Sequence, residues 1–575
     1  MKSLLIVLGC FYLLLSVVSA QNLENVGVKK TLKKGIKFTG GLGFKHSYYQ
    51  ATGIEERFNP NAYIINGNVT ANVYGISIPM TFVYSNQKPR YNIKTPQPFN
   101  IVGISPTYKG YTLHLGYRNM TFSKYTLSGH TFYGVGAEVK KGKWYVGMMG
   151  GRMLKAVQYD SLTNTMPIHE RRGYGLKVGY RNKGDEISIM SFYARDEKNS
   201  VSAYPSTLAV YPQENHVYSI SFKKKINKLI TLNFEGARSG LTLNTNDTSR
   251  IESGVAMNSI YGIQNTSSTV FSTAFNAGID IKAGKGKLGA QVEKVDPNFS
   301  TLGTYYMNAD FQNITVNASY PFWKKKLNLN GRIGVQEDDL SGEKMTKMKR
   351  VVSSLSGTVK FSKKLSANFG YSNFNSHLNV KPIDQAFAQN TSYDKADTMN
   401  YVQINKSMNA GINFKPLIST NVLHNIMINA NYNVSSNEAP LSTIATSMYG
   451  SNAVYSVKLK KTGVGLGLNG NYNLNEYQLG KSTFAGVGFT ASVPALKKKM
   501  KIAVSGRMTN NFENKVLTAK LYSLTNNYNY KLNKHHSLSF TLRYNARQTI
   551  AEAELSYYKE TFDEFMANFG YNYRF

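Results

Sequence analysis

Residues 425–434 read NIMINANYNV, and this stretch carries the pattern that decides the fold. Apolar side chains stand at every even position, whereas the odd positions carry four asparagines and one methionine. Successive side chains of a β-strand point to opposite faces, so a period of two predicts a strand with one apolar and one polar face.

The same alternation recurs in roughly 22 to 26 segments of the chain. Clear examples are residues 327–336, 500–509 and 538–545. The predicted short polar turns include residues 140–143, 182–185, 283–286 and 531–534. The predicted long loops, rich in Asn, Ser, Thr and Gly, are residues 239–267, 375–398 and 435–455. Short turns together with long loops are typical of a barrel whose two ends face different compartments.

Two closed β architectures fit this periodicity, a string of soluble sandwiches and a membrane barrel. Sandwich domains bury their apolar face and are separated by linkers at intervals of about 100 residues, and the sequence shows no such linkers. The polar faces contain Arg332, Arg507 and Arg543, which a dry core would not tolerate but a water-filled lumen does. The sequence therefore predicts an all-β fold, a single transmembrane antiparallel β-barrel of about 24 strands within a range of roughly 20 to 26.

The first 20 residues differ from the rest. Lys2 precedes an apolar run over residues 4–18, and Val18, Ser19 and Ala20 supply the small residues of a cleavage site. We expect a signal peptide at 1–20, a short N-terminal periplasmic tail at 21–34 and the barrel at 35–575. Cleavage after Ala20 removes Cys10, the single cysteine. The alternative is a lipoprotein cleaved before Cys10, which would leave residues 11–18 as an apolar mature terminus.

The last strand carries the most specific motif. Phe565, Ala567, Phe569, Tyr571, Tyr573 and Phe575 alternate along one face and end on the terminal residue. This stretch resembles the last strand of Gram-negative outer-membrane β-barrel proteins. The resemblance implies a location in the cell outer membrane, and it implies that Phe569, Tyr571, Tyr573 and Phe575 form the signal read by the barrel-insertion machinery. An ordinary aromatic-rich strand is the alternative.

The resemblance is to a large porin-like barrel without a plug domain. Energy-coupled receptors of this class carry a plug of more than about a hundred residues, whereas only residues 21–35 precede the first strand pattern here. Aromatic residues near strand ends would form girdles at the two membrane interfaces, although β propensity alone also favours them. These are Tyr48, Tyr49, Tyr74, Tyr84, Tyr108, Tyr117, Phe322, Trp323 and Tyr571.

The chain is strongly basic, with 68 Lys and Arg against 33 Asp and Glu. Much of the excess lies in predicted turns, at residues 223–225, 324–326, 363–364, 460–461 and 497–499. We identify no nucleic-acid-binding fold and no continuous basic face, so no nucleic acid partner is expected. Lysines at strand tips are expected to meet outer-membrane lipids and lipopolysaccharide, and solvated turns are the alternative.

A smaller basic set lies on the polar face and would line the lumen. Its members are His114, Arg118, Arg332, Lys501, Arg507 and Arg543. A positive lumen favours anions. Residues 96–152 combine Ser105, Pro106, Gly134 and Gly151 around this face, which predicts an inward-folded constriction or a partner-docking edge, with a glycine-rich bend in the wall as the alternative.

Catalytic and metal-binding motifs are weak. Ser128 and His130, like His46 and Ser47, lack a third orienting group nearby, and His535–His536 and His169–Glu170 lack further ligands. We therefore expect no enzyme, no cofactor and no metal. The predicted function is a passive channel for small polar or anionic solutes. The alternatives are a non-conducting structural subunit that assembles with other outer-membrane proteins and, with less support, a membrane-embedded hydrolase.

Overall fold

The structure is a computed structural model that describes most of the chain after residue 34. The described residues are 35–86, 100–162, 165–249, 251, 262–263, 265–338, 340, 342, 349–373, 404–417, 419–439, 442–478, 480–550 and 560–575. The predicted signal peptide and tail, the predicted loop at 375–398 and part of the 96–152 stretch lie outside them.

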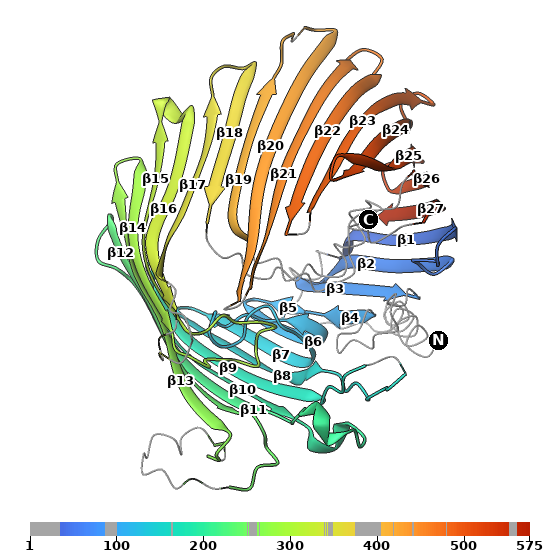
Figure 1. Cartoon of the computed structure of the whole chain (residues 1–575). Coiled ribbons are helices and arrows are strands. Elements are labelled where there is room, and N and C mark those ends of the chain that lie inside the picture. The colour runs from blue at the N-terminus through green and yellow to red at the C-terminus, as the bar shows by residue number, and fades with distance from the viewer. Residues whose placement is uncertain are drawn as a thin grey trace.

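The described residues form one antiparallel sheet that closes on itself through β1 and β27 (Figure 1). The strands are β1 (Ile36–Thr52), β2 (Asn61–Val73), β3 (Ile76–Ser85), β4 (Ile101–Ile104), β5 (Thr107–Tyr108), β6 (Tyr111–Asn119), β7 (Thr131–Lys141), β8 (Trp144–Leu154), β9 (Arg171–Asn182), β10 (Asp185–Asp196), β11 (Glu214–Lys225), β12 (Ile230–Thr242), β13 (Thr269–Ala283), β14 (Gly286–Val295), β15 (Phe311–Phe322), β16 (Leu327–Asp338), β17 (Lys349–Lys360), β18 (Leu365–Ser372), β19 (Ile404–Phe414), β20 (Val422–Ala439), β21 (Ser442–Leu459), β22 (Gly465–Tyr477), β23 (Gly480–Ala495), β24 (Met500–Glu513), β25 (Val516–Lys531), β26 (His536–Thr549) and β27 (Phe562–Arg574). Because β4 and β5 share one place between β3 and β6, the barrel has 26 strand positions. The predicted all-β barrel is confirmed, at the upper limit of the predicted strand number.

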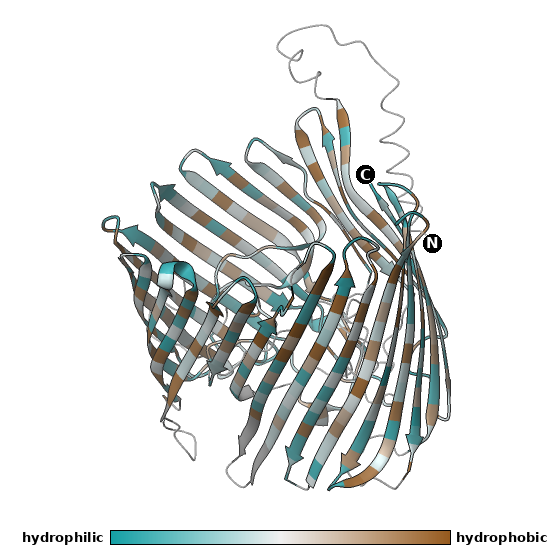
Figure 2. Ribbon diagram, turned by 90° about the horizontal axis from the view of Figure 1, so that it is seen from above, coloured by the Kyte–Doolittle hydropathy of each residue, from teal (hydrophilic) through white to brown (hydrophobic). Residues whose placement is uncertain are grey.

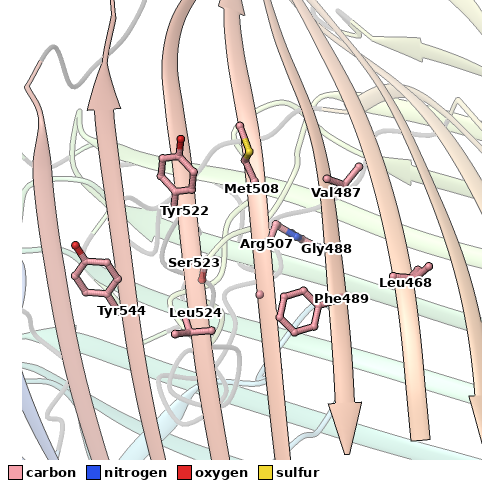
Figure 3. Close-up of a pocket in the computed structure, with 11 residues that line it drawn as sticks. Leu468, Val487, Gly488, Phe489, Arg507, Met508, Tyr522, Ser523, Leu524 and Tyr544 are labelled. Atoms are coloured by element: carbon pink, nitrogen blue, oxygen red, sulfur yellow. The ribbon is translucent and has the colours of Figure 1, made fainter.

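One face of the sheet is apolar and exposed. Ile428, Leu468 and Val487 are 48%, 62% and 68% exposed, which a water-soluble protein would not tolerate in continuous rows. Figure 2 shows the resulting alternation of hydrophobic and hydrophilic bands along the strands. Figure 3 shows the outer face of the wall, where Leu468, Phe489 and neighbouring apolar side chains line a shallow groove of about 510 Å³. Such a surface is suited to acyl chains.

The two ends of the barrel differ in their connections. At one end, which we call the short-turn end, strands are joined by tight turns such as residues 142–143, 183–184 and 284–285, as predicted. Ile36 and Arg574, the first and last strand residues, lie at this end. The opposite end, which we call the long-loop end, carries the longer connections 120–130, 197–213 and 296–310.

The predicted loop at 435–455 is wrong. β20 continues to Ala439 and β21 begins at Ser442, with continuous pairing such as Asn437 with Ile444. The Ser, Thr and Asn content predicts a loop, yet these residues satisfy their backbone hydrogen bonds across the hairpin. The result is a pair of 18-residue strands.

Candidate functional site

Two long-loop-end connections, residues 120–130 and 296–310, fold back against the inner wall, and we call them the loop pair. Tyr174 and Leu176 on β9 are exposed on the outer face, so Gly175 and Lys177 face inward. The Lys177 Nζ donates a hydrogen bond to the Phe122 carbonyl at 2.6 Å. The first loop therefore lies inside the barrel against its wall, whereas a constriction formed by residues 96–152 stays a prediction.

Apolar side chains hold the loop pair in place. Those of the loops are Met120, Phe122, Tyr125, Leu127, Phe299 and Leu302. Those of the inner wall include Met149, Met190, Phe192, Val217, Leu241, Ala274 and Val295. All are buried, and burying each large side chain contributes roughly 1.5–3 kcal/mol. The wall from β7 to β14 thus has an apolar inner face, which the loop pair covers.

Hydrogen bonds join the two loops to each other. The Thr301 hydroxyl donates to the Thr126 carbonyl at 2.7 Å, and the Ser128 N–H donates to the Gly303 carbonyl at 3.1 Å. The loops therefore fold inward as one unit.

Asn215 on β11 fixes the second loop to the wall. Its side chain is fully buried; the Nδ2 donates to the Ser239 Oγ at 2.8 Å, and the Oδ1 accepts from the Leu302 N–H at 3.1 Å. On the first loop, the Tyr125 hydroxyl donates to the Glu293 Oε1 at 2.9 Å, and Lys124 pairs with the same carboxylate. Buried bonds of this kind cost about 1–3 kcal/mol when one partner is removed.

His130 is the buried titratable group at the end of the first loop. Its ring stacks on Tyr305 with centroids 4.1 Å apart. Burial lowers the pKa of His130 to about 4; the hydrogen bond to the Thr131 carbonyl opposes this shift, and the nearby Arg171 adds to it. The loop pair is therefore packed around a neutral imidazole at neutral pH.

The wall facing the loop pair is lined by uncharged amides. The side chains of inward asparagines fill the space next to inward glycines of neighbouring strands. At Gly450, for example, an added Cβ would lie 2.4 Å from the Asn431 Oδ1 and 2.9 Å from the Asn473 Oδ1. Gly411 has the same relation to Asn368 and Asn429. The asparagine side chains therefore place amide groups on the wall of the lumen.

Two of the predicted lumen residues are held in the wall. Arg118 donates to the Thr81 Oγ1 at 2.8 Å and to the Ile104 carbonyl at 3.3 Å, so it ties β6 to β3 across the short strand β4. The His114 Nδ1 lies 2.9 Å from the Ser105 Oγ, and its Nε2 is buried with no hydrogen-bond partner among the described residues. No carboxylate of the described residues orients this ring, so the Ser–His contact lacks the third member of a triad.

The other four predicted lumen residues share the face of the inward asparagines. The Arg332 Nη2 donates to the Gln291 Oε1 at 2.6 Å, and the Arg507 Nη2 lies 3.5 Å from the Asn469 Oδ1. Lys501 lies at the short-turn end of β24, and Arg543 lies midway along β26. No ion pair within the described ranges includes Lys501, Arg507 or Arg543.

Lys45 on β1 is an inward-facing lysine that was not among the predicted lumen residues. Its neighbour Phe44 is exposed on the outer face, so Lys45 faces inward. The alternation of side chains along residues 36–52 places Lys45 on the same face as Gly43 and Ser47.

The predicted insertion signal lies at the seam that closes the barrel. β27 pairs with β26 and with β1, and the Phe575 N–H donates to the Gly40 carbonyl at 3.0 Å. Phe569 is exposed on the outer face, and the Tyr571 hydroxyl lies 2.7 Å from the His536 Nδ1. Tyr573 packs its ring edge-on against Phe575, with centroids 4.8 Å apart. Reading of these residues by the insertion machinery stays a prediction.

One predicted girdle residue is placed differently. Tyr49 is buried on the inner side of β1, where its hydroxyl donates to the Glu564 Oε1 at 2.7 Å and Arg57 pairs with the same carboxylate at 3.3 Å. Tyr49 follows Tyr48 directly, so the two rings must point to opposite faces. Tyr48 is the exposed one.

The described residues hold no group of three or more His, Cys, Asp or Glu side chains placed to bind a metal ion. None of the helical segments in the described part of the chain is long and apolar enough to cross a membrane.

A closed antiparallel sheet with an exposed apolar outer face, an inner wall lined by amides opposite the loop pair, and inward-folded loops defines the class of large, porin-like membrane β-barrels. Comparison with protein-family models finds no match, and comparison with curated proteins finds none either.

Solved structures similar to this chain are barrels of several kinds. An anion-selective porin from Comamonas acidovorans is 11% identical with a TM-score of 0.26, and the match covers 63% of this chain and 100% of the porin. The P pilus usher (PapC) translocation pore is 10% identical with a TM-score of 0.30, covering 94% and 99%. The ferric preacinetobactin receptor BauA from Acinetobacter baumannii is 8% identical with a TM-score of 0.33, covering 93% and 81%. At these scores the class assignment depends on the barrel's own geometry.

Proposed function

We propose that the protein is a passive, porin-like channel of the outer membrane for small polar solutes, with a preference for anions. The observation that carries the proposal is the division of the inner wall. The loop pair covers the apolar part between β7 and β14, whereas the amide-lined part opposite is polar and faces the lumen. A barrel of this size leaves room for water beside its inward loops.

Charge in the middle of the lumen supports anion preference. Lys45, Arg507 and Arg543 lie well inside their strands on the inner face, and no carboxylate of the described residues pairs with them. Cations that no described carboxylate pairs with raise the local concentration of anions in the lumen, and the effect reaches about 8–10 Å at physiological salt.

Planar-bilayer recording tests the proposal. We expect purified protein to conduct and its reversal potential in a KCl gradient to indicate chloride over potassium. The combined variant Lys45→Gln, Arg507→Gln, Arg543→Gln should lose most of that preference while still conducting. Lys406→Gln with Lys520→Gln, which removes outward-facing charge, is the control and should leave the reversal potential unchanged.

The alternatives give different results in the same preparation. A structural subunit of a larger assembly would not conduct and would co-purify with other outer-membrane proteins. A membrane-embedded hydrolase would turn over ester or peptide substrates, and this turnover would be lost on Ser105→Ala or His114→Gln.

A further inference from the structure

The short-turn end carries a ring of lysines whose side chains face into the mouth of the lumen. We call them the mouth lysines. They are Lys37, Lys223, Lys225, Lys282, Lys287, Lys360, Lys458, Lys501 and Lys531. Each lies among the first or last three residues of its strand, and the strands are spread from β11 through β25 to β1.

Strand phase sets the direction of these side chains. On β11, Phe222 between Lys223 and Lys225 is exposed on the outer face, so both lysines face inward. On β14, Leu288 is exposed on the outer face, which places its neighbour Lys287 inside. Ile281, Ile36 and Leu459 do the same for Lys282, Lys37 and Lys458. For Lys360 and Lys531, the phase follows from exposed residues further along the strand, Leu355 and Leu524. For Lys501, it follows from its neighbour Ile502, which pairs with the exposed Val493.

The mouth lysines are exposed, and one of them, Lys225, lies beside an acidic side chain, because its backbone N–H donates a hydrogen bond to the Asp185 Oδ1 at 2.8 Å. Within the described ranges, none of them makes a side-chain hydrogen bond or ion pair. The few carboxylates at this end serve other cations: Asp185 pairs with Lys224 at 2.6 Å, and Glu186 with Arg181 at 2.9 Å. Glu138, near the short-turn end of β7, pairs with Lys140 at 2.8 Å, and Asp280, two residues before Lys282, is a further inward carboxylate near the ring.

The ring includes a like-charge pair. Lys282 on β13 is the direct cross-strand partner of Lys287 on β14. Like charges directly opposite in a sheet destabilise it. An anion that bridges both ammonium groups removes this repulsion, and an anion with several charges can contact lysines of several strands at once.

We propose that the mouth lysines form a binding ring for multivalent anions that carry several phosphate groups, and that such solutes enter the channel from the short-turn end. Lipid headgroups are not the ligand, because the inward phase turns these side chains away from the bilayer. The entry direction depends on the proposed channel function, whereas binding by the ring does not.

Sided block of the open channel by inorganic tripolyphosphate tests the inference. We expect tripolyphosphate to block from the short-turn side at a concentration at least tenfold lower than from the other side. Asn514→Cys, biotinylated at the long-loop end and capped by streptavidin, identifies the orientation of each inserted channel. Equal block from both sides would overturn the inference.

Two matched variants locate the binding groups. Lys282→Gln, Lys287→Gln, Lys458→Gln and Lys501→Gln together should weaken block from the short-turn side at least tenfold. Removing the same charge from turn apices, with Lys285→Gln, Lys325→Gln, Lys363→Gln and Lys498→Gln, should weaken it less than threefold. Equal losses in both variants would show that block depends on the overall positive charge of this end, and would overturn binding by the mouth lysines.

Equilibrium binding separates this inference from the proposed function. If the protein passes no current, the channel proposal fails, and calorimetric titration of detergent-solubilised protein with tripolyphosphate still tests the ring. We expect saturable binding that is at least tenfold weaker in the mouth-lysine variant. No binding by the native chain would overturn the ring itself.

Discussion

At the scale of residues, His130 couples the docking of the loop pair to pH. Its pKa is about 4 in the docked loop because of burial, against an ordinary value near 6.5 when the loop is free. A free loop therefore binds a proton in a pH range where the docked loop does not. Docking is fully stable above pH 6.5 and becomes progressively less stable as pH falls from 6.5 towards 4.

We therefore expect channel conductance to rise as pH falls from 6.5 to 4, because the loop pair leaves the lumen. His130→Gln, which cannot be protonated, should show a flatter conductance profile across this range. His114 is present in both proteins, so the difference between the two profiles isolates His130. Identical profiles would contradict the role given to this residue.

Sequence phase predicts the face of a residue but not its partners. The alternation around residues 501–507 and 543 is enough to place Lys501, Arg507 and Arg543 on the polar face. It cannot show that Arg118 reaches across β4 to β3, because that contact depends on the register of three strands. Tyr49 illustrates the same limit, since its burial requires Arg57 and Glu564 from distant parts of the chain.

At the scale of elements, the fit between β9 and the first loop depends on a glycine. A Cβ at Gly175 would lie 2.6 Å from the Phe122 ring. Gly175→Val should therefore displace Phe122, and overpacking of this kind costs about 1–3 kcal/mol, or roughly 5- to 150-fold in the docked population.

Single-channel recording and limited proteolysis measure the effect of Gly175→Val. We expect a larger or noisier conductance and faster cleavage within residues 120–130. Gly470→Val is the matched control, because Gly470 faces outward and has no neighbour closer than the Gly486 carbonyl, 4.0 Å from the added Cβ. Unchanged cleavage in Gly175→Val would contradict the docked position of Phe122.

The sequence predicts the strands and turns better than the inward loops. Strand periodicity and the turns at 142–143 and 284–285 depend on local residues, which is why they agree with the structure. The fold-back of residues 296–310 depends on an apolar inner wall that is assembled from strands β7 to β14. No local sequence pattern specifies that surface. The hairpin of β20 and β21 shows the converse case, because its polar composition predicts a loop whereas the residues form paired strands.

At the scale of the whole molecule, the barrel is asymmetric in two directions. Around its circumference, an apolar wall covered by the loop pair faces a polar wall of amides and of cations that pair with no carboxylate of the described residues. Along its axis, the short-turn end carries the mouth lysines, whereas the long-loop end supplies the inward loops. Composition and period predict the closed barrel, but these asymmetries follow from the closure of the sheet, which brings strands from distant parts of the chain to one rim.

The central claim is that the apolar face of this sheet meets lipid and the asparagine face meets water. Ile428 and Asn429 are adjacent on β20, and both are exposed, on opposite faces. Cysteine substitution of each, in protein reconstituted into liposomes, allows labelling with a membrane-impermeant thiol reagent. The account predicts rapid labelling of Asn429→Cys with a drop in conductance, and no labelling of Ile428→Cys unless a lipid-soluble reagent is used. Rapid aqueous labelling of Ile428→Cys with protection of Asn429→Cys would contradict it.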